Sequence, residues 1–192
     1  MHDFFAYMDR TKLIRRWGLM RNTETENLSE HLYQTAILAH ALAVIDNELF
    51  GGEIDTGRVA LASLYHDAPE IITGDLPTPI KYYNEEIRAS YSKIEEETTQ
   101  MLLSKLPDFM RDSYRDIITC ALLSEHEKRI IKAADTLSAY IKCLRERMAG
   151  NRDFREAERS TEAKLRAMEL PALKYFMDEF LGAFDLTIDD IK

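Results

Sequence analysis

The sequence predicts an all-α protein built as one compact helical domain. Apolar residues recur three or four positions apart along most of the chain, which is the spacing of one face of an α-helix. Only 7 of the 192 residues are glycine and 5 are proline, so few positions interrupt these runs. A chain of this length can bury a sizeable core. Because no internal repeat, low-complexity segment or linker divides it, we expect residues 1–192 to form a single domain.

Composition and charge argue against several kinds of partner and location. The formal net charge is −9 and no basic run occurs, so a non-specific nucleic-acid or anionic membrane surface is not expected. Cys120 and Cys143 lie far apart and form no CxxC pair, as expected of core thiols in a reducing compartment. Charges within positions 1–13 do not fit a signal peptide, and no run approaches the ~20 apolar residues of a membrane span. We therefore expect a cytoplasmic protein.

The N-terminal region predicts a short helix followed by a cationic stretch. Aromatic and aliphatic residues in positions 4–14 follow helical spacing. Positions 15–21 then hold three arginines and the only tryptophan, Trp17. Two interpretations stay open: an arginine-capped helix end with Trp17 packed on the core, or a phosphate-binding arginine beside an aromatic wall.

A polar segment rich in helix-capping residues, positions 22–31, precedes a largely buried helix at 32–49. His31 lies in the first turn of that helix. Alone, such a histidine is more often structural or solvated than a metal ligand. His40 lies deeper in the helix, and we interpret it as a packed or surface residue. Gly51 and its neighbouring glycine end the helix.

Asp55 or Thr56 caps the next helix, which leads into the sequence Tyr65-His66-Asp67-Ala68-Pro69-Glu70. Neighbouring side chains on a helix diverge by roughly 100°, so the adjacent histidine and aspartate can bind one ion from two directions. The glutamate follows one turn later on the same face. The proline is expected to free the carbonyl of the tyrosine and to distort the helix. For an isolated His-Asp pair, a charged helix end is the commoner explanation.

Beyond this motif the chain predicts a stiff loop and then a series of helices. Two prolines and a glycine in residues 73–79 make an unusually rigid connection beside the motif. Ser124 and Glu127 fit a capping box, so His126 is expected at the surface of a first turn. The amphipathic runs place helices at residues 81–105, 107–122, 125–149, 153–169 and 171–181.

Asp135 interrupts the apolar face of the helix at 125–149 and therefore needs a cation, either an arginine or a metal. Together with His31, His66 and Asp67 it forms a set of four candidate ligands from three helices. Mixed nitrogen and oxygen donors suit Mn²⁺, Co²⁺, Fe²⁺, Ni²⁺ or Zn²⁺. The absence of thiolates is typical of a catalytic rather than a structural site.

The order H…HD…D on successive helices resembles the HD-domain metal-dependent phosphohydrolases. The match extends to the bacterial HD-domain 5′-deoxynucleotidases and covers nearly the whole chain. The segments that carry this resemblance are RW at 16–17, TENLSEH at 25–31, HDAPE at 66–70, TGDLPTPIK at 73–81 and KAAD at 132–135. One departure is Pro69, where some relatives carry a small polar residue; we expect it to affect the position of Glu70 rather than the chemistry.

The resemblance implies an HD-domain helical bundle that hydrolyses 2′-deoxyribonucleoside 5′-monophosphates to deoxyribonucleosides and phosphate. It assigns one divalent ion, with cobalt commonly the most activating, to the metal ligands His31, His66, Asp67 and Asp135. By the same similarity, Glu70 orients or deprotonates the attacking water. Arg16 clamps the phosphate. For Asp75 two roles stay open, proton donor to the leaving oxygen or sugar ligand.

The resemblance also implies how the substrate is recognised. Trp17 is expected to crowd the 2′ position of the sugar and so to exclude ribose. No cluster of amide side chains is placed to read a base edge, so tolerance of different bases is expected. The implied substrate-binding residues are Arg16, Trp17, His31, Asp67, Asp75, Leu76, Pro77, Thr78 and Lys81. Relatives are dimers, so a homodimer is expected, with a small-molecule substrate and neither nucleic acid nor membrane as a partner.

Two alternatives remain at this stage. Another HD phosphohydrolase, acting on a nucleoside triphosphate, a cyclic nucleotide or an alarmone, would need more cations or a second metal cluster. Near the motifs the sequence offers only Arg15, Arg16, Arg21 and Lys81. A nucleotide-sensing HD module without catalysis would typically have lost ligands or the nearby acid, whereas all of them are present.

Overall fold

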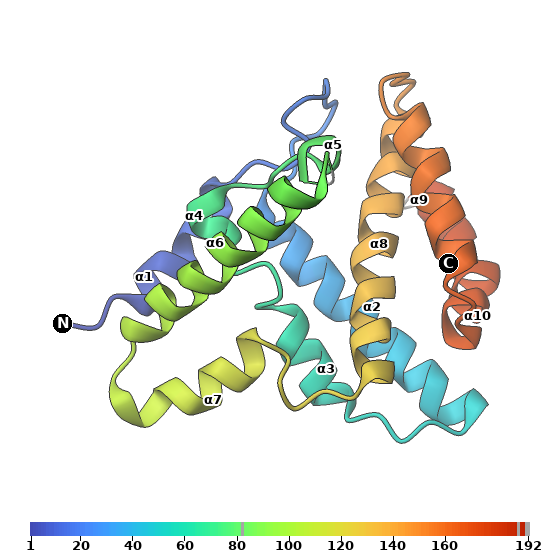
Figure 1. Ribbon diagram of the computed structural model, residues 1–192. Coiled ribbons are helices and arrows are strands. Elements are labelled where there is room, and N and C mark those ends of the chain that lie inside the picture. Colours follow the sequence, from blue (N-terminus) through green and yellow to red (C-terminus); the bar gives the residue numbers. More distant parts are fainter. Residues whose placement is uncertain (82, 188, 191–192) are drawn as a thin grey trace.

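Two long helices, α2 (Leu28–Phe50) and α8 (Glu125–Met148), pack against each other at the centre of the molecule (Figure 1). The computed structural model describes residues 1–81, 83–187, 189 and 190, without the side chain of Thr78. Over these ranges the backbone forms helices and turns and no strand, apart from one isolated β-bridge between Arg15 and Asn27. The predicted all-α class is therefore confirmed.

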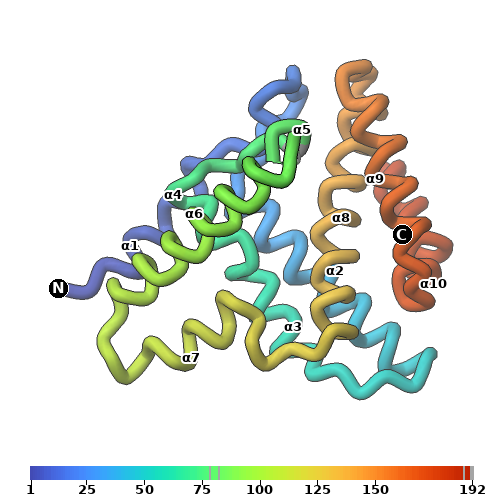
Figure 2. The backbone as a smooth tube through the Cα atoms, viewed as in Figure 1, coloured from blue at the N-terminus to red at the C-terminus, as the bar shows by residue number. Residues whose placement is uncertain are grey.

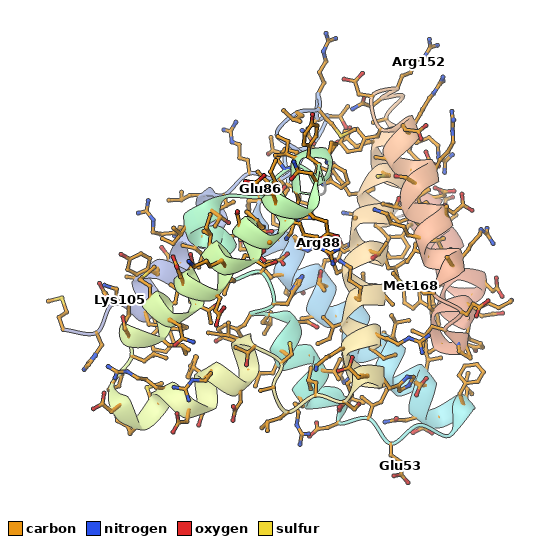
Figure 3. All side chains as sticks on the ribbon, in the orientation of Figure 1. Glu53, Glu86, Arg88, Lys105, Arg152 and Met168 are labelled. Carbon is orange, nitrogen blue, oxygen red and sulfur yellow. The ribbon has the colours of Figure 1, made fainter. Side chains whose placement is uncertain are left out.

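The remaining elements flank this central pair. On one side of α8 lie the C-terminal helices, and on the other lie α6 and α7 (Figure 2). The other elements are α1 (Phe4–Met8), η1 (Asp9–Leu13), α3 (Thr56–Ser63), α4 (Glu70–Thr73), α5 (Thr78–Lys81), α6 (Glu85–Ser104), α7 (Asp108–Ile118), α9 (Arg155–Ala167), α10 (Pro171–Glu179) and η2 (Leu181–Asp185). Charged side chains project from the periphery, for example Glu53 between α2 and α3 and Arg152 between α8 and α9 (Figure 3).

Helix α2 begins four residues earlier than predicted from its apolar run. Asn27 accepts the backbone N–H of Glu30, and the Glu30 side chain accepts the backbone N–H of Asn27, which completes a capping box. Leu28 is fully buried and anchors the first turn. Gly51, with φ of +73°, ends the helix in the left-handed conformation that glycine adopts most easily. His31 therefore lies inside a well-formed helix.

Buried apolar residues form two clusters that meet at the His-Asp motif. The larger cluster joins α2, α3, α8 and the C-terminal helices and includes Val59 and Ala62 of α3. The smaller cluster joins α1, α6 and α7 and includes Ala68. The segment between Ala62 and Ala68 thus passes from one core to the other. His66 and Asp67 are held between buried Ala62 and Ser63 at the end of α3 and buried Ala68 after the turn.

The helix predicted to continue through His66 and Asp67 is interrupted. Helix α3 ends at Ser63, and the following turns are closed by i to i−3 hydrogen bonds, including Ala68 N–H to Tyr65 O at 3.0 Å. The predicted release of the Tyr65 carbonyl by Pro69 is therefore wrong. Pro69 instead occupies the N-cap position of the short helix α4, where its missing N–H costs little.

Two further helices differ from the sequence predictions at their boundaries. The helix predicted at 81–105 begins only at Glu85, because Asn84 caps α6, and the short helix α5 precedes it. Helix α7 stops at Ile118, four residues before the predicted end. Helix α8 agrees with prediction, including its capping box at Ser124. Among the described residues, no helix is long and apolar enough to cross a membrane.

Candidate metal centre

Four side chains converge where α2, α8 and the turn after α3 meet. One ligand atom from each of His31, His66, Asp67 and Asp135 lies within 4.8 Å of all the others. His31 Nε2 is 3.6 Å from an Asp67 carboxylate oxygen and 3.3 Å from Asp135 Oδ1. His66 Nε2 is 3.2 Å from Asp67 Oδ2. The structure thus brings together the four ligands predicted from sequence.

The hydrogen bonds behind the two histidines fix which nitrogen faces the cluster. His66 Nδ1 lies 2.7 Å from the Ser63 carbonyl, which can only accept, so Nδ1 carries the proton. His31 Nδ1 lies 3.2 Å from Ser138 Oγ, which donates its own proton to Gln34 Oε1 at 2.9 Å and so accepts from the imidazole. Both Nε2 atoms are buried without a hydrogen-bond partner. Two lone pairs therefore point into one cluster, as a metal site requires.

The carboxylates of Asp67 and Asp135 favour positive charge in their surroundings. Burial alone would lower the pKa of the His66 imidazole, but Asp67 and Asp135 raise it to about 9. Burial would raise the pKa of Asp67, yet the neighbouring imidazoles, His66 above all and then His31, hold it well below its usual range. Asp135 also accepts a 2.6 Å hydrogen bond from Lys132, a cation that the sequence prediction did not name. The donor set fits a divalent ion.

Glu70, the first residue of α4, is a buried carboxyl group beside this cluster. One of its oxygens, Oε2, has no hydrogen-bond partner. Burial raises the pKa of Glu70 and the charges of Asp67 and Asp75 add to the effect, so that it reaches about 9 despite the opposing charges of Arg16 and Lys81. The Glu70 carboxyl group would ionise more readily with additional positive charge nearby. A divalent ion bound at Asp67 would supply that charge.

Arg16 and Trp17 approach the loop that follows α4. Arg16 Nη1 lies 3.7 Å from Asp75 Oδ1, and its Nε lies 3.6 Å from Glu26 Oε1. Burial would lower the pKa of Arg16, but Asp75 and Glu26 raise it. The Trp17 backbone N–H donates to Asp75 Oδ2 at 3.3 Å. Residues 16, 17 and 75, distant in sequence, are therefore neighbours, as the sequence interpretation required.

The loop from 73 to 81 is fastened to α6 at both ends. Lys81 Nζ donates to Glu95 Oε1 at 3.0 Å and lies 4.7 Å from the centre of the Tyr91 ring. The Thr73 and Tyr91 hydroxyls are 3.0 Å apart. Leu76 and Pro77 are half-buried, whereas the side chain of Thr78 lies outside the described residues.

Sequence reasoning missed the groups that orient the ligands, including Ser63, Gln34 and Ser138. A backbone carbonyl such as that of Ser63 leaves no mark in a sequence. Ser138 lies one turn beyond Asp135 on α8, and Gln34 lies one turn beyond His31 on α2. The only sequence signal for these two side chains is that each follows a predicted ligand by three residues on the same helix. His40 is exposed, and His126 contacts Asp46 at 2.9 Å, so neither joins the cluster.

Comparisons with known proteins identify similar chains. The family described as "5'-deoxynucleotidase YfbR-like" matches residues 3–184. A 5′-deoxynucleotidase of Vibrio vulnificus is 47% identical over 189 residues, which covers 98% of this chain and 97% of that one. A 5′-deoxynucleotidase of Yersinia pestis is 48% identical over 192 residues, covering 100% and 98%.

Solved structures share the fold. An HD-domain phosphohydrolase from Listeria innocua superposes with a TM-score of 0.83 at 24% identity, covering 95% of this chain and 88% of that one. A cyanophage S-2L HD phosphohydrolase, bound to dA and one catalytic Zn²⁺ ion, superposes with a TM-score of 0.69 at 19% identity and covers 95% and 96%. The helical arrangement described above is therefore that of HD-domain phosphohydrolases.

Proposed function

The chain belongs to the YfbR-like 5′-deoxynucleotidase family, and from this membership and the site geometry we infer that it hydrolyses 2′-deoxyribonucleoside 5′-monophosphates. The products are a deoxyribonucleoside and phosphate. The observation that carries the inference is the convergence of two unpartnered imidazole nitrogens and two carboxylates within 4.8 Å, close to a buried arginine. A cation-binding site and a phosphate-binding group are the two requirements of this reaction.

The residues that would hold the divalent ion are His31, His66, Asp67 and Asp135. When bound, such an ion lowers the pKa of a coordinated water and neutralises phosphoryl oxygens. We propose Co²⁺ as the most activating ion in vitro on the basis of the family resemblance, with Mn²⁺, Zn²⁺, Fe²⁺ and Ni²⁺ as alternatives that mixed nitrogen and oxygen donors also accept. Both imidazoles would offer this ion their Nε2 atoms, because Nδ1 is occupied by Ser138 in His31 and by Ser63 in His66.

Three further residues handle protons and charge in this proposal. Glu70 takes the proton of the attacking water, a role that its burial next to Asp67 supports. Arg16 binds phosphoryl oxygens through its planar guanidinium. Asp75 either donates a proton to the leaving 5′-oxygen or holds the sugar. Its contacts with Arg16 and with the Trp17 N–H support a place next to the phosphate and the sugar.

Substrate selection depends on the residues around this centre. Trp17 forms the wall at the 2′ position, so a ribose hydroxyl would clash with it or lose its hydrogen bonds. Leu76, Pro77 and Thr78 contact sugar and base through shape and backbone. Lys81 adds a positive charge from the end of α5.

The remaining proposals concern the oligomeric state and the cellular location of the protein. We propose a homodimer, with the late helices as its interface, because Tyr175 and Phe180 are 37% and 48% exposed. We also propose a cytoplasmic location, because Cys120 and Cys143 are free thiols, as a reducing compartment maintains them.

The test is phosphate release by metal-stripped protein re-supplied with Co²⁺, Mn²⁺, Mg²⁺ or Zn²⁺. The substrates are dAMP, AMP, 3′-AMP and dATP, measured in parallel. The proposal predicts metal-dependent phosphate release from dAMP and little from the other three. Equal rates with 3′-AMP or dATP, or no release from dAMP by metal-loaded protein, would contradict it.

A further inference from the structure

We propose that Glu26 is a positioning residue that holds the phosphate-binding arginine and the sugar-facing tryptophan in one fixed arrangement. The inference rests on the proposed function, because it concerns how Arg16 and Trp17 are presented to a nucleotide. Glu26 lies in the polar segment before α2, near Glu24 and Glu30. Sequence alone does not separate these three glutamates, but the structure gives Glu26 contacts that the other two lack.

The Glu26 carboxylate contacts three parts of the site. Oε2 accepts the indole Nε1–H of Trp17 at 2.7 Å. Oε1 lies 3.6 Å from Arg16 Nε and 3.8 Å from His31 Nδ1. The side chain is only 11% exposed, so these contacts are shielded from solvent. One carboxylate therefore links the sugar wall, the phosphate clamp and a metal ligand.

The main chain of Glu26 is tied to the same segment. Its carbonyl accepts the Arg16 backbone N–H at 3.0 Å, within the β-bridge between Arg15 and Asn27. Asn27 is also the N-cap of α2, the helix that carries His31. Side chain and backbone of Glu26 thus fix residues 15–17 to the start of α2. A shift of Glu26 would move the clamp and the wall together.

Trp17 needs such support because its backbone is strained. Its φ of +59° lies in the left-handed region that residues with a side chain rarely adopt. Asp75 holds its N–H, and Phe154, which is fully buried, packs against the ring with centroids 5.2 Å apart. Glu26 is the acceptor of the indole N–H. Without it, the ring keeps its packing but loses the hydrogen bond that sets its orientation.

Arg16 depends on Glu26 in a different way. Its Nε is buried and has no hydrogen-bond partner within the usual distance, so the nearby negative charge of Glu26 compensates it. This contact lies at the Nε edge of the guanidinium, while Asp75 lies 3.7 Å from Nη1 at the outer edge, where the proposal places the phosphoryl oxygens. Both dAMP and AMP carry the same phosphate. A disturbance of Arg16 should change their rates equally, whereas a disturbance of Trp17 should change the ratio between them.

Three substitutions at one position separate these effects. Glu26→Gln keeps the length and one acceptor oxygen for the indole N–H but removes the charge. Glu26→Asp keeps the charge but cannot reach the indole. Glu26→Ala removes both, and Glu24→Gln is the matched control at an exposed position nearby. If Glu26→Ala fails to fold, the aspartate variant still gives the answer.

The measurement is the ratio of kcat/KM for dAMP to that for AMP in cobalt-loaded protein. The proposal predicts that Glu26→Asp and Glu26→Ala lower the ratio about tenfold, the usual scale of discrimination by one pocket contact. Glu26→Gln should keep the dAMP-to-AMP ratio within about twofold of the parental value. It should change KM for both nucleotides by one common factor. Folded aspartate and alanine variants with the parental ratio would overturn the proposal.

A second measurement does not depend on activity. Trp17 is the only tryptophan of the chain, so emission excited at wavelengths that its nine tyrosines do not absorb reports, in metal-free protein, on this side chain alone. Emission should shift in the aspartate and alanine variants and stay near the parental value in Glu26→Gln and Glu24→Gln. Unchanged emission in all variants would overturn the positioning role even if the enzyme assay worked. An inactive parent with the expected emission shifts would instead refute the proposed function and leave the positioning intact.

Discussion

Glu70 and Asp67 are neighbouring acidic groups whose surroundings push their pKa values in opposite directions. Burial raises the pKa of Glu70 to about 9, with the charges of Asp67 and Asp75 adding to it. Burial acts on Asp67 too, but His66 and His31 hold its pKa well below the usual range. Such a separation is expected where one carboxylate binds a cation and the other exchanges protons. The two residues therefore suit different roles in one reaction.

Glu70→Gln tests the proton-handling role. The amide keeps the size of the side chain but cannot accept a proton from water, so phosphate release from dAMP should fall roughly 10²–10⁴-fold. The four proposed ligands are untouched, so metal content by elemental analysis should stay at the parental level. A variant that retains full turnover would show that the base lies elsewhere.

Asp135→Asn tests the ligand set at its α8 end. The substitution removes one negative charge 3.3 Å from His31 Nε2 while leaving the helix intact. We expect metal content and phosphate release to fall together, because a neutral amide binds a divalent ion weakly. Ser138→Ala is a milder companion variant, since it removes only the hydrogen bond behind His31 and should cost about 10–100-fold in metal affinity. Full metal occupancy in Asp135→Asn would contradict the assignment.

At the scale of elements, the segment before α2 is held to α8 by a buried ion pair. Glu146 is 1% exposed and pairs with Lys142 one turn earlier. Its carboxylate also accepts the backbone N–H of Thr23 at 3.0 Å, and Lys142 donates to the Glu24 carbonyl at 2.5 Å. These contacts fix the chain immediately before Glu26. A polar network outside the four-residue cluster thus supports the site.

This network predicts a specific loss of stability in acid. Burial would raise the pKa of Glu146, but hydrogen bonds from Lys142, Asn151 and Thr23 lower it to about 2. A group with a lowered pKa stabilises the fold above its ordinary pKa of 4.5, and this contribution disappears as the pH falls from there to about 2. At about 1.4 kcal/mol per pKa unit, this group contributes about 3 kcal/mol to the free energy of unfolding at neutral pH.

Urea unfolding at pH 6, 4 and 3 measures that contribution. Glu146→Gln should be less stable than the parent at pH 6, and the difference should shrink as the pH falls to 3. Other carboxylates also titrate in this range, so the difference between the two proteins, rather than either curve alone, isolates Glu146. A constant difference at all three pH values would exclude the ionised network.

The elements that sequence predicted well are those with strong periodicity and caps. Helix α8 and its capping box at Ser124 agree with prediction because an apolar face and a serine-to-glutamate spacing are local signals. The turn through His66 and Asp67 was wrongly predicted as continuous helix. Its path depends on burying Ala62 in one cluster and Ala68 in the other, which is a tertiary effect.

At the scale of the whole molecule, the site lies where two hydrophobic clusters meet. The larger cluster fixes His31 and Asp135 through α2 and α8, and the smaller one anchors the far side of the His-Asp turn through Ala68. Sequence motifs predicted the cluster of His31, His66, Asp67 and Asp135 because its residue types and their order are distinctive. They did not predict Glu26 or Ser138, whose contacts arise when separate segments pack together, nor Lys132, which donates to Asp135 three residues further along α8.

The most direct test of the account is a titration of metal-stripped protein with Co²⁺, in which bound metal and phosphate release from dAMP are measured on the same samples. If the four residues form one catalytic metal site, turnover rises in proportion to bound Co²⁺ and levels off at one ion per chain. A chelator should then remove the bound Co²⁺ and abolish the turnover. Full turnover by stripped protein, or turnover that does not follow metal content, would contradict the central claim.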